Sequence, residues 1–342
     1  MKSFINRNTN NIRLSVMLIV ILIAMTLLKP QFYPTKANFV SMGMQLPEYG
    51  LIALGCALAM MVGGIDLSLV GIANLVAIVV GSALKNFVAV EAATGSVILM
   101  MVICTVFGII TGALCGAVNG FLIGYFKIPA ILATLGSMQL YTGIGMVITR
   151  GKVVTQFPDI FSEYGTYIIA GFLPVPFILF ALCSIVVWFI AERSTFGIKI
   201  RLLGTSARAS QLTGYNNTSI LIRTHLLGGI LAAFSGMIML ARMNSARADF
   251  GTSYTMQAIL MAVLGGVNPN GGFGSISGVI IAGFILQSFA SGLNMFGALN
   301  AYFKEFAWGV TLLLAFIINY LGNKQKGIKA LRERSKDYGS NT

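Results

Sequence analysis

Charged and chemically reactive side chains are scarce in this sequence of 342 residues. Only 10% of the residues are Asp, Glu, Lys or Arg, and the chain has one histidine and four cysteines. His225 has no carboxylate or second ligand at helical spacing, which argues against a metal site or a histidine proton relay and predicts a structural role. The cysteines lie inside apolar runs without zinc-type spacing, and we expect them to be small buried residues: Cys56, Cys104, Cys115 and Cys183.

Long apolar runs are abundant instead. Hydrophobic residues make up 56% of the chain, and the mean hydropathy is +0.85. Several runs approach the roughly 20 residues that a helix needs to cross the hydrocarbon core of a bilayer. The sequence therefore predicts an all-α, polytopic bundle of about ten transmembrane spans, at approximately residues 12–29, 46–65, 68–88, 95–126, 129–149, 168–191, 220–241, 255–268, 275–297 and 302–322.

The distribution of basic residues predicts the topology. The formal net charge is +13, but the Lys and Arg residues flank apolar segments instead of forming one polar surface, which argues against nucleic acid as a partner. Their excess falls in the N-terminal tail, around residues 193–223 and in the C-terminal tail, so the positive-inside rule places both termini in the cytoplasm. We expect an uncleaved first span, a membrane domain over residues 1–322 and a basic cytoplasmic tail over 323–342 that contacts lipid headgroups.

Residues 192–219 form the longest internal polar segment, which this topology places on the cytoplasmic side. The segment contains more apolar residues than a solvated connector requires, namely Ile198, Ile200, Leu202, Leu203 and Leu212. Two interpretations follow: the segment lies along the lipid headgroups, or it docks on a soluble partner protein. Docking is favoured, because a short helix pressed into a partner's groove would bury some of these side chains.

Glycine recurs at every fourth position of the expected fourth span. This spacing places five glycines along one helix face, where a second helix can approach closely. A solute path would require a more polar lining, and only Asn119 lies nearby. The pattern therefore predicts a helix-packing face made of Gly108, Gly112, Gly116, Gly120 and Gly124.

Asp66 is an acidic residue between two apolar segments, preceded by Gly63 and Gly64. A carboxylate at bilayer depth costs at least about 2.5 kcal/mol unless it is paired, hydrated or neutralised. Asp66 could bind a hydroxyl-rich solute or a proton, or it could cap, together with Ser68, a helix that starts near Leu69. The adjacent glycines, which permit an abrupt change of backbone direction, favour capping and a hinge.

Residues 61–68 resemble residues 263–270, where Gly265 and Gly266 occupy the places of the first pair of glycines. Transporters commonly contain such repeats, with interrupted helices at corresponding places in the two halves. Amides in apolar surroundings could hydrogen-bond a sugar-like solute or join neighbouring helices. The candidate path or hinge residues are therefore Gly63, Gly64, Asp66, Ser68, Asn74, Gln139, Gln257, Gly265, Gly266, Gln287 and Asn294.

Three strings in the sequence carry a family resemblance. They are Gly63-Gly64-Ile65-Asp66-Leu67-Ser68, Asn244-Ser245-Ala246-Arg247-Ala248-Asp249-Phe250-Gly251 and Val263-Leu264-Gly265-Gly266-Val267-Asn268-Pro269-Asn270-Gly271-Gly272-Phe273-Gly274. They resemble the signature, the periplasmic loop and the following glycine turn of ribose-type ABC importer permeases, which are inner-membrane components of binding-protein-dependent transport systems. The likeness covers roughly residues 45–320.

The resemblance implies a multi-pass permease of the bacterial cytoplasmic membrane that imports a monosaccharide or similar polyol. It further implies a second permease copy or paralogue, two ABC ATPase subunits and an extracytoplasmic solute-binding protein. The ATPase would contact the 192–219 segment, in which the residues matching the family's docking loop are Phe196, Gly197, Gly204, Arg208, Leu212 and Gly214.

The chain itself encodes no ATP site, because Gly145 to Lys152 has the wrong spacing for a P-loop and Val153 follows the lysine. ATP is thus expected on the partner subunit, and this chain is expected to carry no cofactor, metal or catalytic residue.

The sequence is also compatible with other functions. An ion-coupled secondary transporter would also have about ten spans, although it would need more ionisable groups inside the membrane. A permease for another solute, such as a branched-chain amino acid or a nucleoside, is a second alternative. A membrane enzyme lacks support, because neither a metal-ligand cluster nor a nucleophile–base pair is evident.

Overall fold

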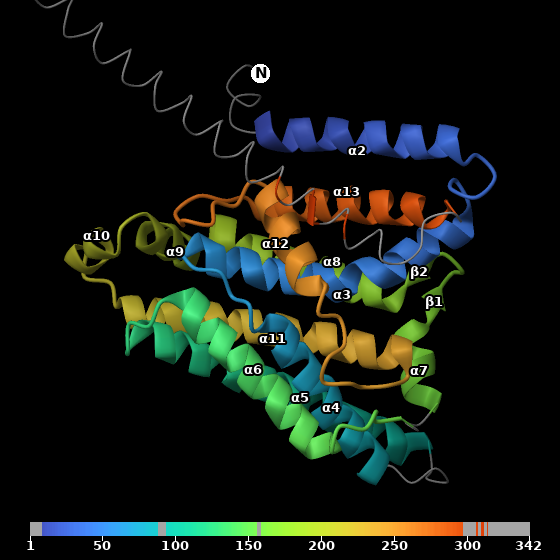
Figure 1. Cartoon of the computed structure of the whole chain (residues 1–342), viewed down its shortest axis with the longest axis horizontal. Helices are drawn as coiled ribbons and strands as arrows, with labels where there is room; N and C mark the ends of the chain where they lie inside the picture. Colours follow the sequence, from blue (N-terminus) through green and yellow to red (C-terminus); the bar gives the residue numbers. More distant parts are fainter. Residues whose placement is uncertain are drawn as a thin grey trace, which may run out of the picture.

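The computed structural model describes residues 9–87, 94–155 and 159–296, together with residues 306, 309, 310 and 313. These residues form a helical bundle with one very short β-hairpin (Figure 1). The elements in chain order are α2 (Thr9–Leu28), α3 (Lys36–Met61), α4 (Leu69–Phe87), α5 (Thr94–Gly124), α6 (Ala130–Thr149), α7 (Asp159–Thr166), β1 (Ile168–Ile169), β2 (Leu173–Pro174), α8 (Val175–Trp188), the π-helix η1 (Phe189–Arg193), α9 (Thr195–Thr205), α10 (Ala207–Leu212), α11 (Asn217–Met243), α12 (Tyr254–Leu264) and α13 (Ile276–Asn294).

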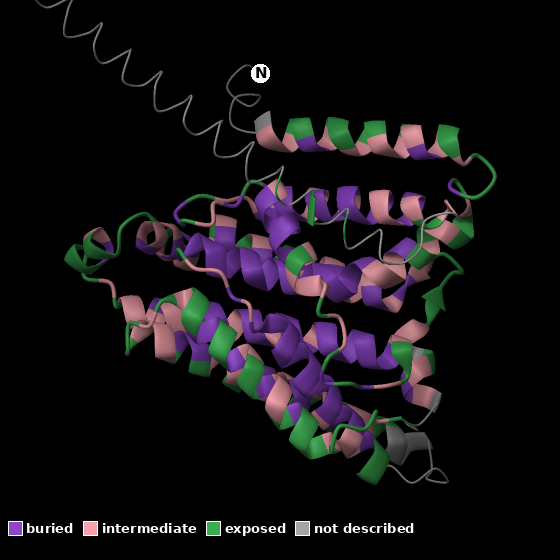
Figure 2. Cartoon of the chain, in the orientation of Figure 1, coloured by how far each residue is buried: buried purple, intermediate pink, exposed green. Residues whose placement is uncertain are grey.

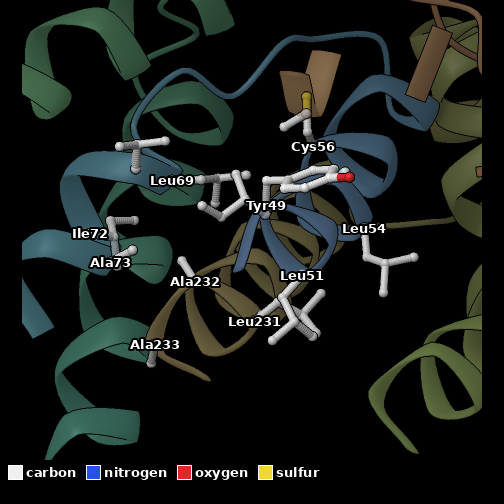
Figure 3. Close-up of a cluster of buried hydrophobic side chains, with 14 of the residues drawn as sticks. Tyr49, Leu51, Leu54, Cys56, Leu69, Ile72, Ala73, Leu231, Ala232 and Ala233 are labelled. Atoms are coloured by element: carbon white, nitrogen blue, oxygen red, sulfur yellow. The ribbon is translucent and has the colours of Figure 1, made fainter. Parts of the chain in front are cut away.

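Helix α3 forms the centre of the bundle. From Leu46 to Met61 every residue is buried, because α4, α8, α11, α12 and α13 surround the helix (Figures 1 and 2). A helix that is apolar on nearly all sides suits such a buried position. Figure 3 shows part of the resulting core, in which side chains of α3, α4 and α11 meet, including Leu51, Leu69 and Leu231.

The outer helices have the opposite burial pattern. Helices α2, α5 and α6 expose large apolar side chains along much of their length, as the green segments of Figure 2 show. Among the described residues, eight helical segments are long and apolar enough to cross a membrane: α2, α3, α4, α5, α6, α8 with η1, α11 and α13. Exposed apolar side chains on such helices indicate contact with lipid. The prediction of an all-α polytopic bundle is confirmed.

Three predicted boundaries differ from the structure. Helix α3 begins at Lys36, ten residues earlier than expected, since Thr35 caps it by accepting from the Asn38 amide. Residues 168–174, expected at the start of a span, form the antiparallel β1–β2 hairpin before α8. The expected span at 255–268 is the 11-residue α12. At 1.5 Å per residue α12 is only about 17 Å long, too short to cross the core alone. The expected tenth span, 302–322, and the 323–342 tail lie outside the continuously described residues.

The glycine face of α5 lies against α11. Added Cβ atoms at Gly112, Gly116 and Gly120 would overlap backbone atoms of α11, including the carbonyl oxygen of His225 under Gly116. Gly124 approaches Thr218 of α11, whereas Gly108 instead faces valines of α4. The two backbones therefore touch along several turns, which places α11 between α3 and α5 (Figure 1).

Candidate functional site

Two glycine turns interrupt the helices at one end of the bundle. The first glycine turn (residues 62–68) separates α3 from α4, and the second glycine turn (residues 265–275) separates α12 from α13. Gly63 has a φ of 95° and Gly266 a φ of 91°, a conformation that glycine adopts without the steric cost of a side chain. The positive-inside rule predicts that this end faces the cytoplasm.

The two glycine turns touch each other and α9. The Gly272 amide donates to the carbonyl oxygen of Met61, at 3.0 Å, and links the second turn to the end of α3. Gly204 of α9 lies against the same carbonyl, and a Cβ atom there would be only 2.5 Å from the Gly272 nitrogen. Arg201 of α9 donates to the carbonyl of Gly274. This cluster, called the glycine junction below, joins both turns to the polar segment between α8 and α11.

Additional polar contacts hold the second glycine turn. Glu192 of η1 accepts from the Ile276 amide (2.8 Å) and from the Ser275 hydroxyl (3.2 Å), so a negative charge lies at the N-terminus of α13. From α2, Asn10 donates to the carbonyl of Gly265 and Asn11 to the Ser277 hydroxyl. The start of the first span is thereby fixed to the junction.

The first glycine turn buries Asp66, which is only 3% exposed. Its Oδ1 accepts from the Ser68 amide at 2.9 Å and from the Ser68 hydroxyl at 2.6 Å. The Ser68 hydroxyl also accepts from Asn119 of α5, whose own oxygen accepts from Tyr141 of α6. Asp66 thus supports the backbone immediately before α4, whereas Ser68 bonds to other side chains and not to the amides of α4. The network links the first turn to α5 and α6.

His225 of α11 faces the other oxygen of this carboxylate. Its Nε2 lies 3.9 Å from Asp66 Oδ2, and neither atom has a hydrogen-bond partner among the described residues. Nδ1 lies 3.0 Å from the carbonyl of Leu221, which can only accept, so Nδ1 carries a proton. The sequence predicted a structural role for His225 and did not reveal its approach to Asp66, because helical spacing cannot show a neighbour on a different element.

The sequence reasoning missed an ion pair between α3 and α11. Glu48 of α3 is fully buried and accepts two hydrogen bonds from the guanidinium of Arg242, at the end of α11. The Tyr254 hydroxyl donates to Glu48 Oε2 at 2.6 Å. The sequence did contain a signal for this pair. Glu48 lies inside a predicted span, where an acid requires a partner, and Arg242 directly follows the predicted seventh span. The pair joins α3, α11 and α12.

Asn74 of α4 holds the loop between α11 and α12 in place. Its side-chain amide donates to the carbonyls of Ala248 (3.0 Å) and Phe250 (2.8 Å). On the exposed side of the loop, hydrogen bonds from the Arg247 guanidinium keep the pKa of Asp249 below its usual range. Asn74 is therefore occupied in ordering this loop, and within this chain its amide nitrogen bonds to backbone instead of lining an open polar path.

The other predicted amides are dispersed. Gln287 is buried on α13 and accepts from the Tyr49 hydroxyl at 2.9 Å, as part of a helix–helix contact. Gln257 is half-buried on α12. Gln139 on α6 and Asn294 on α13 are exposed. The structure does not bring these four residues together into one polar cavity.

The predicted docking segment consists of α9 and α10 and has two faces. Gly197 and Gly204 face inward, where added Cβ atoms would overlap the carbonyl oxygens of Ala191 and Met61. Phe196 is half-buried, while Arg208 and Gly214 are exposed. Leu212 is 82% exposed and Ile198 66% exposed. The outward face therefore combines accessible apolar residues with a positive charge, and the inward face rests on the glycine junction.

A multi-span bundle with two interrupted helices and an exposed helix pair is typical of a transport permease. The comparisons with known proteins agree. A family model described as "branched-chain amino acid transport system / permease component" matches residues 38–317, and the chain belongs to this family.

Three similar curated proteins are import permeases. The ribose import permease protein of Haemophilus influenzae is 30% identical over 315 residues, which cover 91% of this chain and 93% of the relative. The Escherichia coli K12 ribose import permease protein is 31% identical, covering 89% and 92%. The autoinducer 2 import system permease protein of Klebsiella pneumoniae is 33% identical, covering 73% and 74%. No solved structure gives a significant match.

The resemblance to ribose-type ABC importer permeases is thereby confirmed. The chain is a permease component of a transport system, not an enzyme, and a multi-pass protein of the bacterial cytoplasmic membrane.

Proposed function

We propose that this permease imports a monosaccharide or a similar small polyol, driven by ATP that a separate subunit hydrolyses. The relatives named for ribose and for autoinducer 2 carry the proposal, because they cover most of the chain. An extracytoplasmic binding protein delivers the solute, and the permease changes only which side of the membrane the path opens to.

The outward face of α9 and α10 is the proposed contact for the ATPase. Exposed Ile198 and Leu212 offer apolar area, and Arg208 a positive charge, on the side that a cytoplasmic subunit can reach. Movement of these helices would act directly on both glycine turns, because Gly204 and Arg201 contact them. The glycine junction is thus the proposed mechanical link between hydrolysis and gating.

A second permease copy is proposed to complete the solute path along α6. Gly136 and Gly143 of α6 have open space where side chains would lie, although glycine destabilises a helix that nothing packs against. Close approach by another helix would explain both glycines. Gln139, between them in sequence and exposed, would then supply a hydrogen-bonding group to solute hydroxyls at the contact between the copies.

Reconstitution tests the proposal. Proteoliposomes containing the permease, with its ATPase inside and its binding protein outside, should accumulate labelled ribose or a related sugar only when ATP is enclosed. Omitting either partner should abolish uptake. Uptake by the permease alone, driven by a proton or sodium gradient, would instead support a secondary transporter.

A further inference from the structure

An apolar cavity of about 260 Å³ opens between four helices of the bundle, away from the glycine junction. Helix α2 forms one wall, and α3, α8 and α13 form the others, with the β1–β2 hairpin at one end (Figure 1). Its lining includes Leu22 of α2, Phe39 and Met42 of α3, Phe177 of α8 and Phe284 of α13. We call this cavity the α2 groove.

The α2 groove offers few polar groups to a sugar. Its polar lining residues are Gln287 and Ser288. The Gln287 side-chain oxygen already accepts from Tyr49, and the Ser288 carbonyl accepts from Tyr33. A hydroxyl-rich solute would lose its hydrogen bonds with water here and gain few in return. The groove therefore suits an apolar chain.

The depth of the groove matches one leaflet of a bilayer. Leu18, the lining residue farthest from the end of α2, is ten residues before Leu28. Ten helical residues span about 15 Å, which is half of a hydrocarbon core about 30 Å thick. Because α2 starts at the cytoplasmic glycine junction, its other end, with the groove, faces the outer leaflet.

Two lysines stand at the headgroup end of the groove. Lys36 begins α3 one turn before the lining residue Phe39, and its amine lies 3.3 Å from the Cβ position of Gly171, beside the lining residue Phe172. Lys29 follows Leu22 by seven residues, or about two helical turns, and therefore lies on the same side of the chain. Its amine lies over the Phe296 ring. Within 9–87, 94–155 and 159–296, neither amine forms an ion pair with a carboxylate.

We propose that the α2 groove binds one anionic phospholipid of the outer leaflet. One acyl chain lies along α2 between Leu18 and Phe39, and the phosphate group lies between the amines of Lys29 and Lys36. The two lysines lie past the end of the apolar lining. This order matches a phospholipid, in which a charged headgroup is followed by a hydrocarbon chain. The bound lipid fills the space between α2 and α8, and thereby fixes the first span to the bundle.

Native mass spectrometry of the delipidated, purified permease tests this site. Titration with palmitoyl-oleoyl phosphatidylglycerol should show one tightly retained molecule, and phosphatidylcholine should be retained much more weakly. Replacing both lysines, as Lys29→Gln with Lys36→Gln, should weaken phosphatidylglycerol binding about 30-fold, or about fivefold for each lysine. Leu22→Trp should abolish the binding by filling the groove.

Two control variants separate this site from general contact with lipid. Lys85→Gln removes an exposed lysine at the end of α4, and Ile19→Trp adds the same bulk to an exposed position of α2 that does not line the groove. Both should retain the lipid, and all variants should keep their melting temperature when lipid is absent. Equal retention of the two lipids, or retention by Leu22→Trp at the wild-type level, would overturn the proposal. So would a cross-link between Leu22→Cys residues of two copies, which would identify the groove as a protein interface.

Discussion

The two glycine turns use the same local structure in different surroundings. In the first, Asp66 accepts from the amide of Ser68, two residues later, and in the second, Asn268 accepts from the amide of Asn270 in the same way. Asp66 is buried beside His225, whereas Asn268 is half-buried. The two turns therefore share this side-chain-to-backbone bond but differ in what packs on it.

This difference assigns a separate task to each turn. The first glycine turn connects through Asp66 to α5, α6 and α11, the helices next to the proposed solute path. The second connects through Glu192 and Asn10 to η1 and α2. The same sequence pattern therefore supplies a bend at both places, and the neighbouring elements determine what that bend moves.

The largest effect should come from breaking the support of the first turn. Gly116→Leu would push a side chain into the backbone of α11 at His225, with no flexible neighbour to yield. We expect a loss of about 3 kcal/mol or more, seen as poor expression or a melting temperature lowered by many degrees in detergent. Val118→Leu is the matched control, because it adds bulk at an exposed position of the same helix. Equal melting temperatures for the two variants would contradict the tight α5–α11 contact.

The next substitution compares the two turns directly. Asp66→Ala leaves the buried amide and hydroxyl of Ser68 without their acceptor, which should cost about 2 kcal/mol. Asn268→Ala removes the equivalent bond at a half-buried position, where water can replace it, and should cost about 0.5 kcal/mol. Denaturation of the two purified variants under identical conditions measures both. If Asn268→Ala proved the more damaging, burial would not be what distinguishes the turns.

A smaller effect is expected from the charge that supports the second turn. Glu192→Gln keeps an acceptor oxygen near the Ile276 amide but removes the negative charge at the start of α13. The stability should fall by about 1 kcal/mol. Glu163→Gln, which removes an exposed acid from α7, should leave the melting temperature unchanged. A similar loss in both variants would mean that net charge matters and the contact with α13 does not.

Local patterns in the sequence predicted much of this arrangement. Apolar runs predicted most of the spans, and the repeated glycine pairs predicted both interrupted helices. Glycine at every fourth position predicted the face of α5 that meets α11. These features depend on residues close together in the chain, so periodicity and turn chemistry reveal them.

Contacts between distant elements could not be read in the same way. The approach of His225 to Asp66 depends on how α11 docks beside the first turn, and the inward position of Gly204 depends on how α9 folds back onto Met61. Each of these features is determined by three-dimensional packing, which a single sequence does not specify by spacing.

In the proposed mechanism, α9 and α10 receive the ATPase and act on both glycine turns through the glycine junction. The residue that tests it most directly is Leu212, because it is exposed and lies outside the junction, unlike Gly204. Gln211→Glu is the matched control, since it adds the same charge at the neighbouring exposed residue of α10.

The decisive measurement is the number of solute molecules imported per ATP hydrolysed in proteoliposomes that contain the permease, ATPase and binding protein. Leu212→Glu should bind less ATPase or hydrolyse ATP without matching uptake, so that uptake falls about tenfold while the melting temperature of the permease is unchanged. Gln211→Glu should retain most of the wild-type uptake. Wild-type uptake with wild-type stoichiometry in Leu212→Glu would show that this face of α10 plays no part in coupling.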